Sequence, residues 1–91
     1  MFKLFVVTPV KVFFEDEVTS VVAPGEAGYL GILSHHAPLI TALKPGTLTI
    51  EDRDERPHRF DLTGGFLEVS NNRVTILADS IEVGTPPERG R

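Results

Sequence analysis

The sequence predicts an all-β domain, a flattened β-sandwich or barrel of eight to ten short strands. Residue types that fit the pleated surface of a sheet (Val, Ile, Phe, Tyr and Thr) make up 30 of the 91 residues. Seven prolines and eight glycines divide the chain into short segments and leave little room for long helices. Apolar and polar residues alternate along most segments, and turn-forming residues separate them at close intervals.

The first half of the chain shows five strand-like segments. Within the first, Phe2, Leu4 and Val6 share one face, and the opposite face also carries apolar side chains. The third has Val18 and Val22 as its apolar positions. Three in-phase residues of the second segment are expected to face the core: Val10, Val12 and Phe14. The five strands are predicted at residues 2–7, 10–14, 17–23, 29–33 and 39–43.

The second half of the chain shows two hairpin patterns. The first joins 47–51 to 58–62 through a charged tip, and its inward positions are predicted to be Leu48, Ile50, Phe60 and Leu62. The second joins 66–69 to 74–78 through a turn that contains Asn71 and Asn72, a residue type that tolerates positive φ. We therefore expect one β-sandwich domain over residues 1–83, followed by a flexible C-terminal tail at 84–91.

Charge and composition exclude several functional classes. The net charge of −4 argues against a nucleic-acid partner bound through phosphate neutralisation. Because the chain has no cysteine, it cannot form a disulfide, a thiolate zinc site or a cysteine nucleophile. The longest aliphatic and aromatic run, residues 4–7, is too short to span a bilayer. The first residues show no secretory or transit pattern, which for a bacterial chain predicts the cytoplasm.

Residues that could carry chemistry are present but poorly placed for it. His35 and His36 are adjacent, so on a strand they point to opposite faces and cannot easily share a metal ion. The carboxylates within 15–17 and 52–55 fall at strand ends, where they are solvated. No serine lies in a nucleophile elbow, and no glycine-rich phosphate motif occurs. We expect no metal, no cofactor and no catalytic residue, so the chain is not predicted to be an enzyme.

An apolar stretch between Pro24 and Pro45 is unusual for a connecting segment. It carries four large apolar residues among several glycines: Tyr29, Leu30, Ile32 and Leu33. Such residues either fold back into the core or form a surface that binds another protein, and the sequence leaves both interpretations open.

Four sequence blocks follow one another in a recognisable order and spacing. They are Pro24-Gly25-x-x-Gly28-x-Leu30-Gly31-Ile32-x-x-x-His36-Ala37-Pro38-Leu39, Thr41-Ala42-Leu43-Lys44-Pro45-Gly46, Gly64-Gly65-Phe66-Leu67-Glu68-Val69 and Val74-Thr75-Ile76-Leu77-Ala78-Asp79. The chain resembles, from about Phe2 to Ile81, the epsilon subunit of F-type ATP synthases. The resemblance implies a sandwich of about ten short strands in two five-stranded sheets.

The resemblance also implies a function. It is that of a non-catalytic central-stalk (rotor) subunit that binds the gamma subunit and the c-ring and couples ion translocation to ATP synthesis. Such a subunit is peripheral, on the cytoplasmic face of the bacterial inner membrane, and associates with the membrane only through the complex. The implied c-ring contacts are Glu26, Gly28, Tyr29, Leu30, Gly31 and Ile32, and the implied gamma contacts are Thr8, His36 and Thr41.

Three departures from the family pattern qualify these expectations. Tyr29 stands where the family usually has Glu, which replaces a charged contact with packing and one hydroxyl. Ser34-His35 stands where the family usually has Pro-Gly. The sequence ends at Arg91, so we expect it to lack the C-terminal inhibitory helices of most bacterial members. The alternative hypothesis is a free-standing small β-sandwich that binds another protein.

Overall fold

The computed structural model describes residues 1–83, so the tail predicted at 84–91 lies outside the described residues. These residues contain nine β-strands. Their bounds are β1 Phe2–Thr8, β2 Lys11–Gly25, β3 Gly28–Ile32, β4 Leu39–Leu43, β5 Gly46–Asp52, β6 Pro57–Leu62, β7 Gly65–Ser70, β8 Arg73–Ala78 and β9 Ile81–Val83. The predicted all-β class is confirmed.

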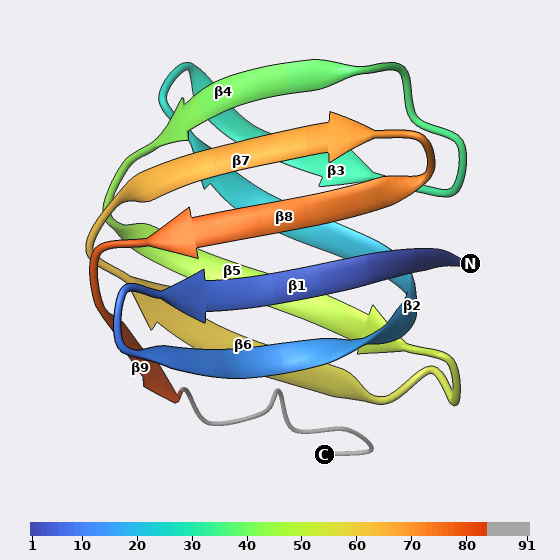
Figure 1. Cartoon of the computed structure of the whole chain (residues 1–91), viewed down its shortest axis with the longest axis horizontal. Coiled ribbons are helices and arrows are strands. Elements are labelled where there is room, and N and C mark those ends of the chain that lie inside the picture. Colours follow the sequence, from blue (N-terminus) through green and yellow to red (C-terminus); the bar gives the residue numbers. More distant parts are fainter. Residues whose placement is uncertain (84–91) are drawn as a thin grey trace, which may run out of the picture.

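The strands form two layers that pack face to face (Figure 1). The front layer has the order β4-β7-β8-β1 and is completed by residues 11–18 of β2, which pair with β1. The back layer is made of β3, residues 18–25 of β2, β5, β6 and β9. Each layer thus has five strands once β2 is counted in both, which is the arrangement of a flattened β-sandwich.

The long strand β2 corrects one sequence prediction. The segments expected as separate strands at 10–14 and 17–23 are halves of a single strand that passes from the front layer to the back layer. The carboxylates at 15–17, predicted to fall at strand ends, lie within this strand, because all three residues pair with β1. Val18 pairs with Phe2 in front and with Asp52 behind, so it marks the crossing point.

The core lies between the two layers and contains only apolar side chains among the described residues. The inward positions predicted for β1 and for the β5–β6 hairpin are confirmed, since all of them are buried. These residues are Phe2, Leu4, Val6, Leu48, Ile50, Phe60 and Leu62.

The prediction for the second segment is wrong at two of its three positions. Val10 lies in the β1–β2 turn and is 92% exposed, and Val12 is 55% exposed. The register shifts in this part of the β1–β2 ladder, where Val6 pairs with Phe14 but Val7 pairs with Val12. The bulge turns Val12 to the outer face and leaves Phe14 packed against the core. A second bulge lies between Val18 and Ser20. Because of it, Val21 faces the core and Val22, which alternation from Val18 would place inside, faces outward.

Candidate functional site

The β2–β3 hairpin holds all six residues predicted to contact a c-ring. Its two-residue loop, Glu26-Ala27, is exposed and joins the paired residues Gly25 and Gly28. Gly28 has φ +134°, which favours glycine. At Gly25, a Cβ atom would lie 2.8 Å from the Gly28 carbonyl oxygen and 2.5 Å from the Leu30 side chain, so the tight hairpin favours glycine there.

The side chains of this hairpin divide between core and surface. Tyr29 is 57% exposed, Leu30 is half-buried against the core, and Ile32 is 1% exposed. The interpretation of Ile32 as a surface contact is therefore corrected: its side chain belongs to the core, because it lies inward on β3. Tyr29 and Leu33 remain exposed. The sequence left open whether the apolar stretch after Pro24 lies in the core or on the surface. The structure places Ile32 in the core and Tyr29 and Leu33 on the surface.

Tyr29 is exposed but held in place. Its hydroxyl oxygen accepts a hydrogen bond from the backbone N–H of Thr47 at 3.0 Å. The ring passes close to Gly46, where a Cβ atom would lie 2.9 Å from the Tyr29 hydroxyl and 2.7 Å from Pro24. The side chain is thus fixed over the start of β5 and presents a rigid, half-apolar surface.

A groove of about 290 Å³ runs between β3 and β4. The residues that line it are Gly25, Ala27, Gly28, Tyr29, Leu30, Leu39 and Thr41. The hairpin is joined to the end of β4, because Glu26 N–H donates to the Ala42 carbonyl at 3.0 Å and Lys44 N–H donates to the Pro24 carbonyl at 2.9 Å. The groove therefore brings Thr41, a predicted gamma contact, together with the predicted c-ring contacts.

The three predicted gamma contacts do not cluster. Thr8 ends β1 at one end of the sandwich, whereas His36 lies in the β3–β4 loop at the opposite end (Figure 1). The Thr8 hydroxyl is engaged in the β1–β2 turn, where it donates to the Lys11 carbonyl and accepts from Val10 N–H, both at 3.4 Å. All three residues nevertheless belong to, or lead into, strands of the front layer.

A row of apolar side chains crosses the outer face of the front layer, and sequence reasoning missed it. Cross-strand pairing places one residue from each of the five strands in this row: Ala42, Phe66, Leu77, Val7 and Val12. Phe66, Leu77 and Val12 are 59%, 48% and 55% exposed. Ile40, 73% exposed, extends the patch and helps to line a shallow cavity of about 300 Å³. The only signal in the sequence was the apolar character of both faces of β1.

Basic side chains bound this patch on one side. The next apolar residue of the same face, Phe5, is flanked by the Lys3 ammonium at 5.7 Å and the Arg73 guanidinium at 5.1 Å from its ring centre. These cations cover the ring and make favourable contacts with its π-face. Exposed apolar surface is thereby concentrated around Ile40, Phe66 and Leu77, and we call these three residues with Val7, Val12 and Ala42 the front patch.

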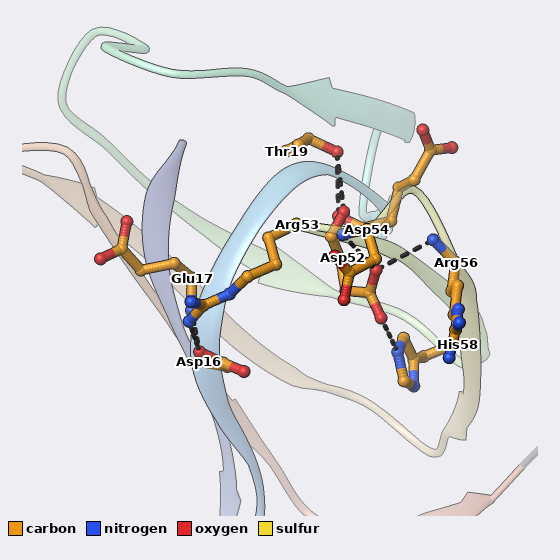
Figure 2. A network of polar contacts seen from close by, with 9 residues as sticks. Asp16, Glu17, Thr19, Asp52, Arg53, Asp54, Arg56 and His58 are labelled. Carbon is orange, nitrogen blue, oxygen red and sulfur yellow. Dashed lines mark hydrogen bonds and ion pairs between the residues drawn. The ribbon is translucent and has the colours of Figure 1, made fainter.

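Charged residues gather at the tip of the β5–β6 hairpin (Figure 2). Asp52 accepts hydrogen bonds from the backbone N–H groups of Asp54 and Arg56 and from His58 Nε2, at 2.8, 2.9 and 2.9 Å. The His58 bond, followed by that from Arg56, lowers the pKa of Asp52 to about 2. Arg53 forms an ion pair with Asp16 of β2.

The hydrogen bonds and the ion pair at the tip have a structural role. They close the hairpin turn upon itself and tie it to the middle of β2. Within residues 1–83, no group of three or more His, Cys, Asp or Glu side chains lies close enough to hold a metal ion.

Residues 1–84 match the family described as the ATP synthase delta/epsilon chain, beta-sandwich domain. The chain belongs to this family. Its curated relatives include the "ATP synthase epsilon chain" of Desulforamulus reducens, 50% identical over 80 residues, which are 88% of this chain and 60% of the relative. The protein of the same name from Chlorobium limicola is 46% identical over 80 residues, 88% of this chain and 91% of the relative.

The length of the relatives differs. The chain spans 60% of the Desulforamulus reducens protein and 59% of the Moorella thermoacetica one, which is 47% identical, but 91% of the Chlorobium limicola protein. The family match covers the described β-sandwich and the residue that follows it.

Two solved structures with this fold are ATP synthases. A chain in the cryo-EM structure of the Euglena gracilis mitochondrial ATP synthase, OSCP/F1/c-ring, superposes with a TM-score of 0.83 at 22% identity, covering 88% of this chain and 51% of that one. A chain in the Tetrahymena thermophila mitochondrial ATP synthase, central stalk/c-ring, gives a TM-score of 0.74 at 22% identity, covering 88% and 64%. At this identity the two likenesses establish the fold. No helix in residues 1–83 is long and apolar enough to cross a membrane.

Proposed function

We propose that this chain is a non-catalytic rotor subunit of an F-type ATP synthase, which binds the gamma subunit and the c-ring and couples ion translocation to ATP synthesis. Membership of the delta/epsilon family supports the proposal that the chain assembles into an ATP synthase. The observation that carries the binding role is the front patch, a continuous apolar surface on the outside of a sheet. The subunit is peripheral, on the cytoplasmic face of the bacterial membrane, and reaches the membrane only through its partners.

The gamma subunit is assigned to the outer face of the front layer. This face offers apolar side chains from five strands, and proteins use such surfaces for stable association. A partner lying along the face would extend from the Thr8 end to the His36 end, since both belong to this layer. Such an interface, centred on Phe66 and Leu77, includes the Thr8 and His36 ends but not Thr41, whose partner on β7 is the buried Leu67 and whose side chain faces the groove.

The c-ring is assigned to the end of the β2–β3 hairpin. Here the loop residue Glu26 is exposed, the ring of Tyr29 is fixed by its hydrogen bond to Thr47, and the groove continues along Leu30 to Thr41. Gly28 and Gly31 leave open space around the backbone, since a Cβ atom at either position would meet nothing within 4 Å. A loop of another protein can therefore approach the hairpin backbone closely.

Two exposed aliphatic residues on opposite faces provide the test of gamma binding. Leu77 lies in the front patch and is 48% exposed, whereas Val22 lies on the back layer and is 41% exposed. Leu77→Thr is expected to weaken binding of purified gamma subunit by about tenfold or more, and Val22→Thr to leave it unchanged. Equal loss with Val22→Thr would overturn the assignment of the face. A wild-type chain that does not bind gamma would instead support a free-standing binding module.

The c-ring assignment is tested by Tyr29→Ala in reconstituted synthase. Truncation removes the anchored ring, so proton-driven ATP synthesis should fall while gamma binding persists. Tyr29→Phe is the matched control, because it keeps the ring and loses only the hydroxyl. Unchanged coupling with Tyr29→Ala would remove this hairpin from the proposed interface.

A further inference from the structure

Asn72 connects three segments at one end of the sandwich. Its side-chain Oδ1 accepts a hydrogen bond from His35 N–H at 2.7 Å, and its Nδ2 donates to the Met1 carbonyl at 3.0 Å. Its backbone carbonyl accepts from Lys3 N–H at 3.3 Å. The β7–β8 turn, the β3–β4 loop and the start of β1 thus meet at one amide side chain.

The β3–β4 loop is tied to the β7–β8 turn through this connection. His35 has φ +62°, in the left-handed region that carries a steric cost for residues other than glycine. The next residue closes the turn, since His36 N–H donates to the Leu33 carbonyl at 3.3 Å. The bond from Asn72 is the contact that compensates the unfavourable conformation of His35, and it comes from a residue 37 positions away.

The loop in turn orients the imidazole of His36. Its Nδ1 lies 2.7 Å from the Ala37 carbonyl oxygen. Because a carbonyl oxygen only accepts, Nδ1 carries the proton of this bond, and Nε2 of the neutral ring is left as an acceptor. The direction in which His36 presents Nε2 is therefore set by the backbone of residues 33–37.

The geometry points to Asn72 as a positioning residue for partner recognition: it holds the β3–β4 loop in the conformation in which His36 meets the gamma subunit. The identity of the partner in this inference rests on the proposed function. The role of Asn72 in holding the loop rests only on its hydrogen bond with His35. Asn71 and Asn72 have φ +52° and +58°, so the tight turn itself aims the Asn72 amide at the loop.

The turn offers a matched pair of variants. Asn72→Gly and Asn71→Gly each place glycine at a positive φ, which glycine adopts without strain, and each removes one amide side chain. Within residues 1–83 the Asn71 side chain makes no hydrogen bond, so Asn71→Gly reports any effect on the turn alone. Asn72→Asp keeps an oxygen that can accept from His35 N–H and loses the donor to Met1.

Hydrogen exchange of the full chain tests the positioning. Asn72→Gly should speed exchange of the His35 amide by about fivefold or more, while Asn71→Gly and Asn72→Asp should leave it within about twofold of the wild type. An unchanged His35 exchange rate in Asn72→Gly would overturn the inference, regardless of the affinity for the gamma subunit.

A double-mutant cycle tests the link to the partner, with the affinity for purified gamma subunit as its measure. Asn72→Gly should weaken gamma binding by about fivefold in the wild type and not at all in a His36→Ala background, because both changes remove the same contact. An equal loss in both backgrounds would overturn the action of Asn72 through His36. If His36→Ala alone leaves gamma binding intact, the proposed gamma contact fails, and the exchange result still decides the holding of the loop.

Discussion

The two layers of the sandwich share a core but differ on their outer faces. The outer face of the back layer carries the pattern of a wet antiparallel sheet, with Thr47, Thr49, Glu51, Arg59, Asp61 and Glu82 on three of its strands. Thr47 and Asp61 are paired across strands by a 3.0 Å hydrogen bond between their side chains. The outer face of the front layer instead carries the front patch.

The difference between the outer faces is not required for the stability of the fold. Both layers bury one face, which the core requires, and an antiparallel sheet normally leaves the other face polar. The strands β5, β6 and β9 of the back layer follow that rule, and their polar outer positions form no apolar patch. The front layer departs from it with three side chains more than 45% exposed in one row, and an isolated domain gains nothing from such exposure. The apolar outer face is therefore not needed by the core, and it supports the proposed association with a partner.

Two phenylalanines provide the largest expected contrast. Phe60 of the back layer is 6% exposed and makes edge-to-face contacts with Phe13 and Phe14 at 6.4 Å, whereas Phe66 of the front layer is 59% exposed. Phe60→Ala is expected to lower the free energy of unfolding by about 3–5 kcal/mol, because it leaves a cavity. Phe66→Ala should lower it by less than about 1 kcal/mol. Urea denaturation of the two variants measures both, and equal losses would mean that the front patch belongs to the core.

Two glycines, one in each layer, give a further contrast. Gly65 begins β7 with φ +147°, and a Cβ atom there would lie 2.1 Å from the Leu77 carbonyl oxygen. Gly31 of β3 has open space around it. Gly65→Ala should therefore cost about 2–4 kcal/mol through strain and collision, and Gly31→Ala should be nearly neutral. Thermal unfolding of both variants tests this, and a tolerated Gly65→Ala would contradict the close approach of β7 and β8.

The hydroxyl of Tyr29 is expected to contribute modestly. Tyr29→Phe removes the acceptor for Thr47 N–H and should lower the free energy of unfolding by about 0.5–1.5 kcal/mol. The ring remains over Gly46 and Pro24, so the groove keeps its shape. Denaturation together with hydrogen exchange of the Thr47 amide measures the effect, and an unchanged exchange rate would show that this bond does not hold the hairpin.

The smallest expected effect appears only in acid. The hydrogen bonds from His58 and from the backbone N–H groups of Arg56 and Asp54 lower the pKa of Asp52 to about 2, below the value of about 3.9 for an unfolded chain. Between these values the unfolded state binds more protons, so the stabilisation by Asp52 is complete above about pH 4 and is lost as the pH falls towards 2. Asp52→Asn should reduce the acid slope of stability in that window. Unfolding measured from pH 7 to pH 2 checks this, and an unaltered slope would exclude Asp52 as its source.

The sequence by itself determined the fold class and most of the core. Alternation placed Leu48, Ile50, Phe60 and Leu62 correctly, because in a hairpin the inward positions follow from the period of two and a short turn. The sequence blocks also identified the family, since they carry the spacing of the glycine and proline turns. Within the β2–β3 hairpin, the same period separates the buried Ile32 from the exposed Tyr29 only once the orientation of the strand is known.

Tertiary structure alone decided the surfaces. The two bulges of β2 change which of its side chains face inward, so Val12 and Val22 lie outside although local alternation favoured the core. The front patch gathers residues from strands that are distant in the sequence, and its members become neighbours only through the β-ladder register. Asn72 and His35 likewise meet only because β8 lies beside β1 and the β3–β4 loop closes over the same end. The core depends on local periodicity, whereas the surfaces depend on which strands pair.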